Sequence, residues 1–461
     1  MNRRPGLGLL GLGLLAIGCG DNVAVPDDAA LLPPDAAPAS NDLDDAPPDV
    51  AYQGDVARFI DVTTATHHLV IDAATGTTTV TSTLMFEQRA AGYPLFDVVQ
   101  QPTEGAIDGV AVSGFPVLPE AGDMRVVPVL LAAGTHDLTL TAPLPDVTRD
   151  VGAEWAAWFG LADFTKRRYT ERYYPSNLLY DRFPVELTID VTNADDTYTV
   201  LTNGDVLADD GRTFVVAYPA WYRASAPFLR IVDDDVVCDR ETTLASVDGR
   251  QVPLRVFTEA ALCDAEVEAR LDEFVLVVTE SFAWLEAHLG VYPQAKLLVA
   301  TRSPSFDYSM EYAGAFEGGA VFHELGHQWF SRSTFPTSGR DEWIDEAITT
   351  FVTDGDDALW LPPVFATAVP SNPLPVVDVA NPYQRGMYVD APALTDPYEA
   401  AELFYAYETW FAEAGLDLFA FLAELHAAHV HDNITTEELR AALVEVLPAK
   451  DAAFERYVYG P

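Results

Sequence analysis

The amino-acid sequence predicts a multidomain α+β protein, in which a β-rich N-terminal domain precedes a mainly helical domain. The chain has 461 residues, whereas a single hydrophobic core usually stops growing at roughly 250 to 300 residues. Hydrophobic residues make up 49% of the sequence, which is enough to build large cores and argues against extended disorder. Strand patterns dominate residues 51–237, and the apolar spacing of helices dominates residues 238–461.

Residues 1–18 are predicted to be a processing signal. Two arginines precede an apolar run that is rich in Gly and Leu and too short to span a membrane. The run ends at Gly18-Cys19 and resembles a bacterial lipoprotein signal, although Ala16 stands where Leu is usual. The resemblance implies that Cys19 carries the lipid and that the protein is a membrane-anchored lipoprotein facing the periplasm or the cell exterior. Ordinary secretion with an incidental Cys is the alternative, and both readings predict export.

Residues 19–50 are predicted to be a linker. They consist mostly of Asp, Ala and Pro and show no hydrophobic period. Such a stretch cannot bury a core, and its like charges repel one another. We expect an extended acidic tether between the lipid and the folded protein.

Residues 51–237 carry the signals of a β-rich domain. Runs of β-branched and apolar residues alternate with clusters of Gly, Pro and Asp. A turn is expected at Thr75-Gly76. Strands are expected at 69–71, 77–86, 126–131, 138–141, 185–191 and 214–217.

The hydrophobic period changes after Cys263. Apolar residues between Val267 and Leu285 fall on one face at helical spacing, and Gly290 is well placed to end that helix. Residues 297–301 read as a buried strand, and most of the chain from Gly319 onward reads as helix. Cys238 and Cys263 could pair in an oxidising compartment, and both are interpreted as structural.

Two histidines with metal-ligand spacing lie in His323-Glu324-Leu325-Gly326-His327. Four residues apart on a helix, the two imidazoles share a face and can bind a single ion. Glu324 projects beside that face, where a carboxylate can act as the general base on a water molecule. Zinc suits such ligands. Histidines that merely pack or face solvent are the alternative for this pattern alone.

A third ligand follows at a fixed distance. Residues 328–345 are eighteen in number, and the next residue is Glu346. A catalytic zinc site usually has three protein ligands, and a carboxylate is one of the common types. The sequence therefore predicts a site for one zinc ion held by His323, His327 and Glu346.

These residues, with Gln328-Trp329-Phe330 and the stretch from Asp341 to Glu346, resemble the gluzincin aminopeptidases of the aminopeptidase N type. Their pattern is HExxH, eighteen residues, then Glu. The resemblance implies a thermolysin-like zinc peptidase domain at 238–461 and hydrolysis of N-terminal residues from peptides. It also implies that the helical C-terminal domain of larger relatives is missing. Weaker matches upstream are Glu171 to Pro175 and Thr202-Asn203-Gly204.

The resemblance implies two further site residues. Met310-Glu311 resembles the loop whose Glu grips the free amino group of the substrate, which implies that role for Glu311; an ordinary acidic loop residue is the alternative. A Tyr at the start of a later helix stabilises the oxyanion in the family. Tyr398 is the first candidate for this role and Tyr405 and Tyr407 are others, although Ala400-Ala401 replaces the usual Lys-Gly and a plain helix start is equally compatible.

Two other features bear on the predicted site. Lys166-Arg167-Arg168 stands where relatives place a substrate-binding Gln or Glu, which puts the first specificity pocket in doubt. His426, His429 and His431 could bind a second metal, but we expect them at a helix C-terminus, where imidazolium complements the helix dipole.

The chain is strongly acidic. Asp and Glu number 71 and Lys and Arg 26, so the formal net charge of -45 disfavours nucleic acid as a partner. Peptide substrates and a membrane lipid are the expected partners, and the sequence does not predict the oligomeric state. The alternatives to an aminopeptidase are a zinc endopeptidase and a catalytically inactive, zinc-containing lipoprotein that binds peptides.

Overall fold

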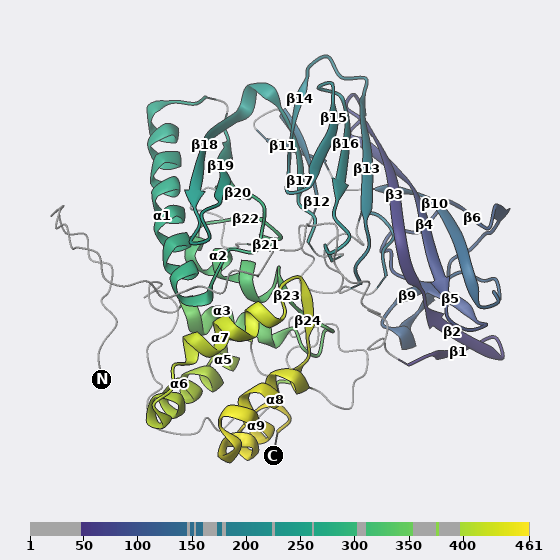
Figure 1. Ribbon diagram of the computed structural model, residues 1–461. Coiled ribbons are helices and arrows are strands. Elements are labelled where there is room, and N and C mark those ends of the chain that lie inside the picture. The colour runs from purple at the N-terminus through teal and green to yellow at the C-terminus, as the bar shows by residue number, and fades with distance from the viewer. Residues whose placement is uncertain are drawn as a thin grey trace.

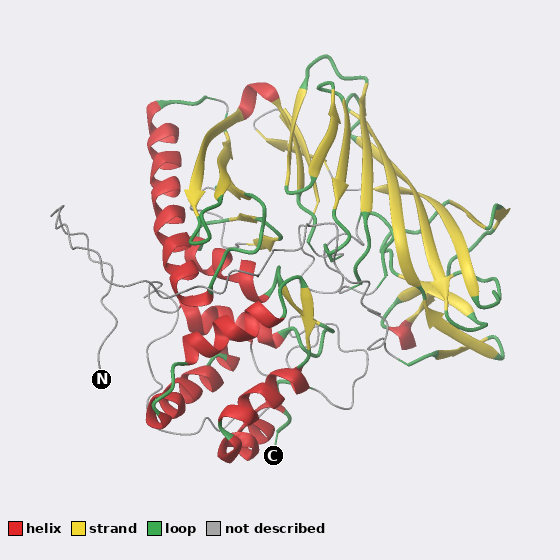
Figure 2. Cartoon of the chain, in the orientation of Figure 1, coloured by secondary structure: helices red, strands yellow, loops and turns green. Residues whose placement is uncertain are grey.

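A computed structural model describes residues 48–144, 148–151, 154–159, 173–177, 181–223, 226–260, 262–301, 310–353, 375–377 and 397–460. Strands gather in the N-terminal part of the chain and helices in the C-terminal part, and a smaller mixed sheet lies between them (Figure 2). The predicted boundary at 237/238 falls inside the first strand of that mixed sheet, after its first residue, and it stays a prediction.

The largest sheet lies in the β-rich part, where eight described strands run in the order β15-β16-β13-β3-β4-β10-β6-β7 (Figure 1). Their bounds are β3 Asp61–Asp72, β4 Thr77–Gln88, β6 Glu104–Ile107, β7 Val110–Ala111, β10 Gly134–Leu144, β13 Val185–Thr192, β15 Asp205–Asp209 and β16 Thr213–Tyr218. In β3 and β4 alternate side chains are buried, so the sheet presents one face to a core. At the predicted turn, the N–H of Gly76 donates to Asp72 at 2.7 Å, and Gly76 adopts a φ of 68°, which suits glycine.

Two smaller sheets flank it. One has the order β1-β2-β5-β9-β8 and the other β11-β12-β17-β14. Their bounds are β1 Val50–Tyr52, β2 Asp55–Phe59, β5 Tyr93–Phe96, β8 Val117–Leu118, β9 Met124–Val126, β11 Thr148–Val151, β12 Glu154–Phe159, β14 Tyr198–Thr202 and β17 Leu229–Asp233. The strand expected at 126–131 was wrong, because β9 ends at Val126. Pro128 lacks an N–H for a ladder, and the N–H of Val129 turns back to Val127 at 2.8 Å.

The mixed sheet has the order β18-β19-β20-β22-β21. Its strands are β18 Val237–Ala245, β19 Gln251–Glu259, β20 Leu297–Ala300, β21 Met310–Tyr312 and β22 Ala315–Glu317. β20 is buried along its whole length, as its apolar run predicts, and β19 and β22 pair with it in parallel. β21 pairs antiparallel with β22 and forms the edge of the sheet within the described chain.

Helices α1 Ala265–Leu289 and α2 Val321–Phe330 pack against this sheet, and further helices continue to the end of the described chain. These further helices are α3 Trp343–Thr353, α5 Pro397–Ala400, α6 Glu402–Ala414, α7 Leu418–Ala428, α8 Thr436–Val446 and α9 Asp451–Val458. A parallel pair, β23 Thr334–Pro336 and β24 Asp432–Ile434, links the loop after α2 to the loop after α7. The side chain of Asp264 caps the first turn of α1 at 3.0 Å, and the predicted Gly290 ends it with a φ of 88°.

A disulfide joins Cys238 at the start of β18 to Cys263 just before α1, with Cα atoms 5.6 Å apart. The sequence left this pairing open. The bond ties the first strand of the mixed sheet to the helix that covers it.

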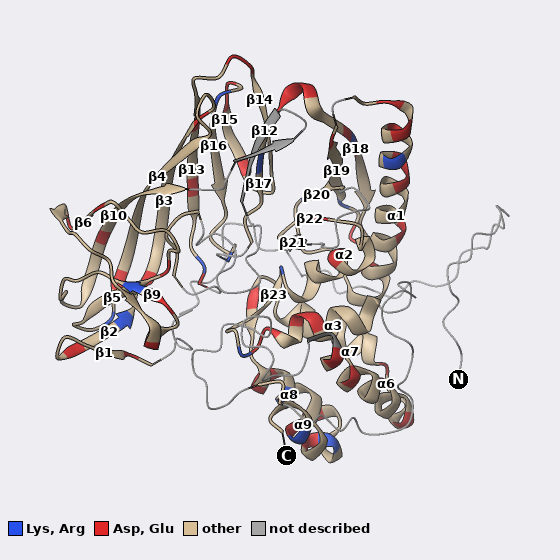
Figure 3. Cartoon of the chain, turned by 180° about the vertical axis from the view of Figure 1, so that it is seen from behind, with Lys and Arg blue, Asp and Glu red and all other residues tan. Residues whose placement is uncertain are grey.

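Acidic side chains occur on both the β-rich part and the helical part (Figure 3). Among the described helices, none combines the length and the apolar character that a membrane span requires.

Candidate metal centre

Helix α2 places both predicted metal-ligating histidines on one face. His323 and His327 lie one turn apart, and their Nε2 atoms are 3.0 Å from each other. The side chain of His327 is 1% exposed and that of His323 is 17% exposed. The pair is therefore covered by protein at His327 and open toward His323.

Helix α3 brings the third residue to this pair. The Oε2 atom of Glu346 lies 3.2 Å from Nε2 of His323 and 3.7 Å from Nε2 of His327. Each of the three residues offers one ligand atom, and these atoms lie within 4.8 Å of one another. No other group of this kind occurs among the described residues. Residues that are 23 positions apart in sequence thus converge on one point.

The two helices approach closely because residue 326 has no side chain. A Cβ atom on Gly326 would lie 3.0 Å from the Cγ2 atoms of Thr349 and Thr353 in α3. A methyl group at this position would press the helices apart. Gly326 therefore sets the distance between the histidines and Glu346.

The start of α3 is fixed by the C-terminal helices. Asp341 accepts hydrogen bonds from the N–H and the hydroxyl of Thr436 at 2.8 Å, and Trp343 Nε1 donates to the same hydroxyl at 3.0 Å. Burial raises the pKa of Asp341, although these hydrogen bonds oppose the shift. Helix α8 therefore holds the helix that carries Glu346.

Both histidines have an oxygen partner at the nitrogen that faces away from the metal site. His327 Nδ1 bonds to the carboxylate of Asp345, and His323 Nδ1 lies 3.3 Å from the hydroxyl of Thr353. That hydroxyl donates to the carbonyl of Thr349 at 2.7 Å, so it is free to accept from His323. Both contacts favour a proton on Nδ1, which leaves the Nε2 lone pairs for an ion.

This donor set fits zinc. Two imidazole Nε2 atoms and one carboxylate oxygen are the ligands of many catalytic zinc sites, which keep a further position open. The oxygen partners of the two Nδ1 atoms match the second shell of such sites. His323, His327 and Glu346 could therefore hold one zinc ion.

Glu324 lies on α2 between the two histidines. Its N–H donates to the carbonyl of Ala320 at 3.0 Å, so it belongs to the first turn of the helix. The residue is 4% exposed. A carboxylate in this position suits a general base that works beside the ion, as the sequence predicts.

Glu311 lies in the edge strand β21, with its Cα paired to that of Phe316 in β22. Its side chain is outside the described part of the structure. The hairpin that carries it ends four residues before α2 begins. The connection between the predicted amine site and the metal helix is thus very short.

The three candidate tyrosines differ in their surroundings. Tyr398 lies in α5, at the start of the helical stretch as predicted, and its side chain is not described. The ring of Tyr405 packs edge-on against Phe351 at 5.3 Å. Tyr407 is buried beside Trp410, and burial raises its pKa. Tyr407 therefore belongs to the helical core, and Tyr398 remains the first candidate.

The second histidine cluster lies at the C-terminus of α7, as expected, but the expected imidazolium is wrong for two of its members. Burial lowers the pKa of His426 to about 3 and that of His431 to about 4. His431 stacks on Trp221 of the β-rich part at 3.8 Å, and its Nε2 contacts the carbonyl of Pro293 at 3.2 Å. His431 therefore joins the two parts of the protein as a neutral ring.

Several sequence predictions lie outside the described residues. These are the signal at 1–18 with Cys19, the linker at 19–50 up to residue 47, and Lys166-Arg167-Arg168. Of the weaker upstream matches, Thr202-Asn203-Gly204 lies at the end of β14, and residues 173–175 of the match from Glu171 to Pro175 are described, with Tyr173 and Tyr174 buried.

Sequence reasoning missed the supporting residues of the site. Asp345 directly precedes the ligand Glu346, and Thr353 follows that ligand by seven residues, about two helical turns. Gln328 was noted only as part of a motif. Its position one residue after His327 was the available signal, but its partners are backbone groups of the preceding hairpin β21–β22, which no local pattern identifies.

Comparisons with known proteins agree with this fold. No protein-family model matches the chain, and no curated protein matches it in sequence. An M1 zinc metallopeptidase from Deinococcus radiodurans is 18% identical, with a TM-score of 0.59, and the match covers 87% of this chain and 95% of that one. A mutant of that peptidase has been solved with a Tyr-Ser-Ala substrate bound.

Two other structural neighbours are larger proteins. LTA4 hydrolase from yeast, in complex with bestatin, is 15% identical with a TM-score of 0.60, over 87% of this chain and 68% of that one. Aminopeptidase A from Legionella pneumophila, in complex with aspartic acid, is 11% identical with a TM-score of 0.66, over 87% of this chain and 49% of that one. At these identities the likeness establishes the fold. The predicted order of a β-rich domain and a mainly helical peptidase-like domain is confirmed.

Proposed function

We propose that this protein is a zinc-dependent aminopeptidase that hydrolyses N-terminal residues from peptides. The observation that carries the proposal is the convergence of His323, His327 and Glu346 within 4.8 Å, beside the buried carboxylate of Glu324. The resemblance of the motifs and the fold shared with M1 zinc metallopeptidases support it.

The residues of the site divide the chemistry among them. A zinc ion, when bound, polarises the scissile carbonyl and lowers the pKa of a water molecule. Glu324 accepts the proton of the attacking water and returns it to the leaving amine, as a general base and then a general acid. Asp345 and Thr353 hold the two imidazoles in the orientation that presents Nε2.

Two further roles belong to the proposal. Glu311 binds the free amino group of the substrate, because a carboxylate beside the metal site pairs with an ammonium and selects for chain ends. Tyr398 donates a hydrogen bond to the oxyanion that forms at the scissile carbonyl. The neighbour solved with Tyr-Ser-Ala is compatible with a peptide substrate here.

We also propose that the protein is exported and anchored in a membrane by a lipid on Cys19. The short apolar run before Gly18-Cys19 and the acidic linker at 19–50 support this location. Metabolic labelling with a radioactive fatty acid tests it. Label should enter the full-length protein and be absent from a Cys19→Ala variant, and an unlabelled wild-type protein would remove the anchor from the proposal.

The function is tested with purified protein loaded with zinc, its Glu324→Gln variant and a chelated sample. Each is assayed on aminoacyl fluorogenic amides and on N-terminally blocked peptides. The proposal predicts cleavage of free-amine substrates only, abolished by both controls. Cleavage of blocked peptides would indicate an endopeptidase, and bound zinc without turnover of either substrate would indicate a peptide-binding lipoprotein.

A further inference from the structure

The hairpin β21–β22 carries the proposed amine-binding residue Glu311 next to the metal helix. Its turn, Ala313-Gly314, is buried between α2 and the β-rich part. We infer that Gln328 on one side, and Asn203 with Tyr222 on the other, are positioning residues that clamp this hairpin and thereby fix the distance between Glu311 and the metal site. The inference rests on the proposed function of Glu311.

Gln328 forms the clamp on the metal side. It follows His327 directly in α2 and is fully buried. Its Oε1 accepts from the N–H of Gly314 at 2.7 Å, and its Nε2 donates to the carbonyls of Tyr312 at 3.0 Å and Ala315 at 3.4 Å. One side chain thus bonds to backbone groups on both arms of the hairpin and at its turn.

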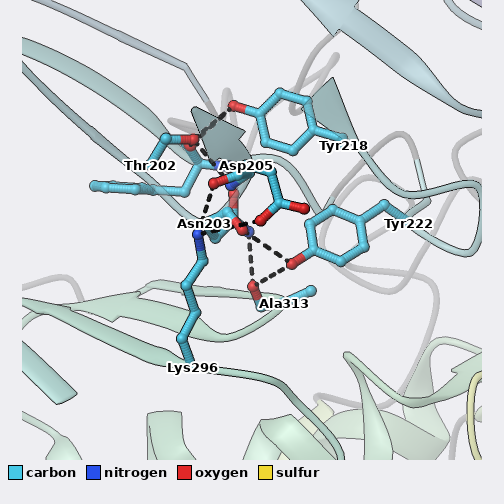
Figure 4. A network of polar contacts seen from close by, with 9 residues as sticks. Thr202, Asn203, Asp205, Tyr218, Tyr222, Lys296 and Ala313 are labelled. Carbon is cyan, nitrogen blue, oxygen red and sulfur yellow. Dashed lines mark hydrogen bonds and ion pairs between the residues drawn. The ribbon is translucent and has the colours of Figure 1, made fainter. Parts of the chain in front are cut away.

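Asn203 and Tyr222 form the clamp on the other side (Figure 4). Asn203 Nδ2 donates to the carbonyls of Ala313 and Ala226, both at 2.7 Å, and its Oδ1 accepts from the N–H of Phe228 at 2.7 Å. The hydroxyl of Tyr222 lies 3.2 Å from the carbonyl of Ala313 and 3.3 Å from that of Asn203. The carbonyl of Ala313 therefore accepts from Asn203 Nδ2, and it shares the single proton of the Tyr222 hydroxyl with the carbonyl of Asn203.

The turn itself has little room to adapt. Gly314 adopts a φ of 65°, and a Cβ atom there would lie 2.9 Å from the carbonyl oxygen of Lys296. The carbonyl of Gly314 also accepts from the N–H of Leu298 at 2.9 Å. A buried hydrogen bond is costly to break when its partner stays buried. The hairpin is thus held from the sheet, from the metal helix and from the β-rich part together.

A fixed position of the hairpin is needed if the enzyme is to select the N-terminus of a peptide. An exopeptidase must hold the amino group at a set distance from the scissile carbonyl, and displacements of about 1 Å at such a site reduce rates strongly. The backbone of Glu311 is separated from the clamped turn by one residue, Tyr312, whose buried ring packs on Phe228 at 5.0 Å. Loosening the clamp would let the amine site move relative to the metal helix.

A matched pair of tyrosines allows a sharp test. Tyr218 and Tyr222 are both buried, and their ring centroids are 6.0 Å apart. The hydroxyl of Tyr222 contacts Ala313 of the hairpin, whereas that of Tyr218 bonds to the carbonyl of Phe228 at 3.0 Å and does not reach the hairpin. Tyr222→Phe and Tyr218→Phe therefore remove the same group from the same core, and only the first touches the clamp.

We expect Tyr222→Phe to lower kcat/KM for free-amine substrates about fivefold, mostly through a higher KM, and Tyr218→Phe to leave it within about twofold. In a Glu311→Ala background, the additional loss from Tyr222→Phe should disappear, because the clamp acts through Glu311. An equal loss in both backgrounds, or equal effects of the two tyrosine variants, would overturn the inference.

A second measurement does not need peptidase activity. Hydrogen exchange of residues 310–317 is followed in the apoprotein for wild type, Gln328→Met and Tyr218→Phe. Gln328→Met removes the acceptor of the Gly314 N–H, so exchange in this segment should accelerate at least tenfold, while Tyr218→Phe should leave it unchanged. An unchanged segment in Gln328→Met would refute the clamp. If Gln328→Met accelerates exchange as predicted but the zinc-loaded wild-type protein turns over no substrate, the proposed function is refuted and the clamp still stands.

Discussion

Replacing Asp345 by Ala should weaken zinc binding more than any other single change outside the three ligands and Glu324. Asp345 is the carboxylate that accepts from His327 Nδ1, and its side chain is 11% exposed. The variant removes both the hydrogen bond that orients the ring and the negative charge that favours the cation. Asp345→Asn keeps an acceptor oxygen and removes only the charge, so it separates the two contributions.

The expected size follows from the burial of the pair. Loss of such a supporting residue typically costs 10- to 100-fold in metal affinity, or about 1.4 to 2.8 kcal/mol. Because the side chain of His327 is only 1% exposed, water cannot replace the lost partner, and Asp345→Ala should lie near the upper end. Asp345→Asn should lie near the lower end.

Thr353→Val is the matched control on the other histidine. The hydroxyl of Thr353 is neutral and lies 3.3 Å from His323 Nδ1, and the side chain of His323 is 17% exposed. Neutral hydrogen bonds are about half as strong as those to charged groups. We therefore expect a loss of about threefold or less, since water can take the place of the hydroxyl.

The assay is zinc competition with a chromogenic chelator, on protein whose folding is checked by circular dichroism. A cobalt-substituted sample adds an absorption spectrum that reports the geometry of the ligands. The expected order of affinity is wild type, Thr353→Val, Asp345→Asn and Asp345→Ala. Zinc binding by a folded Asp345→Ala protein within twofold of wild type would refute the assigned role of Asp345.

Three other changes test the structure. Gly326→Ala should lower zinc affinity roughly tenfold in the same competition assay, because the added methyl would press against α3, and an unchanged affinity would show that the helices adjust. The double variant Cys238→Ser/Cys263→Ser opens a loop closed across 25 residues and should lose about 3 kcal/mol in urea unfolding, whereas an unchanged midpoint would contradict a structural disulfide. Burial holds the pKa of His426 at about 3 instead of 6.5, so between those values the unfolded chain binds the extra proton and stability falls as the pH falls. His426→Leu should remove up to about 1.4 kcal/mol per pH unit of this acid sensitivity between about pH 6 and pH 4, and unfolding curves with the same pH slope as wild type would count against a neutral His426.

Local patterns in the sequence were sufficient for most elements of the fold. Helix α1 was predicted from its apolar spacing and from Gly290, and β20 from its unbroken apolar run, because these signals act within a few residues. The prediction of a strand at 126–131 was wrong for a reason that the sequence itself contains, since Pro128 has no N–H to donate to a β-ladder. The protonation state of the buried His426 could not be predicted from the sequence, because its desolvation comes from residues that are distant in the chain.

The same division holds for the site. The sequence by itself determined which residues can bind a metal, because the spacing of His323 and His327 on a helix and the position of Glu346 are properties of the chain. Only the tertiary structure decided how these groups are held. The pairing of His327 with Asp345, the approach of α3 to Gly326, and the clamp that Gln328 and Asn203 place on the hairpin all join separate elements. Their partners are chosen by packing, and packing depends on the whole chain rather than on any local pattern.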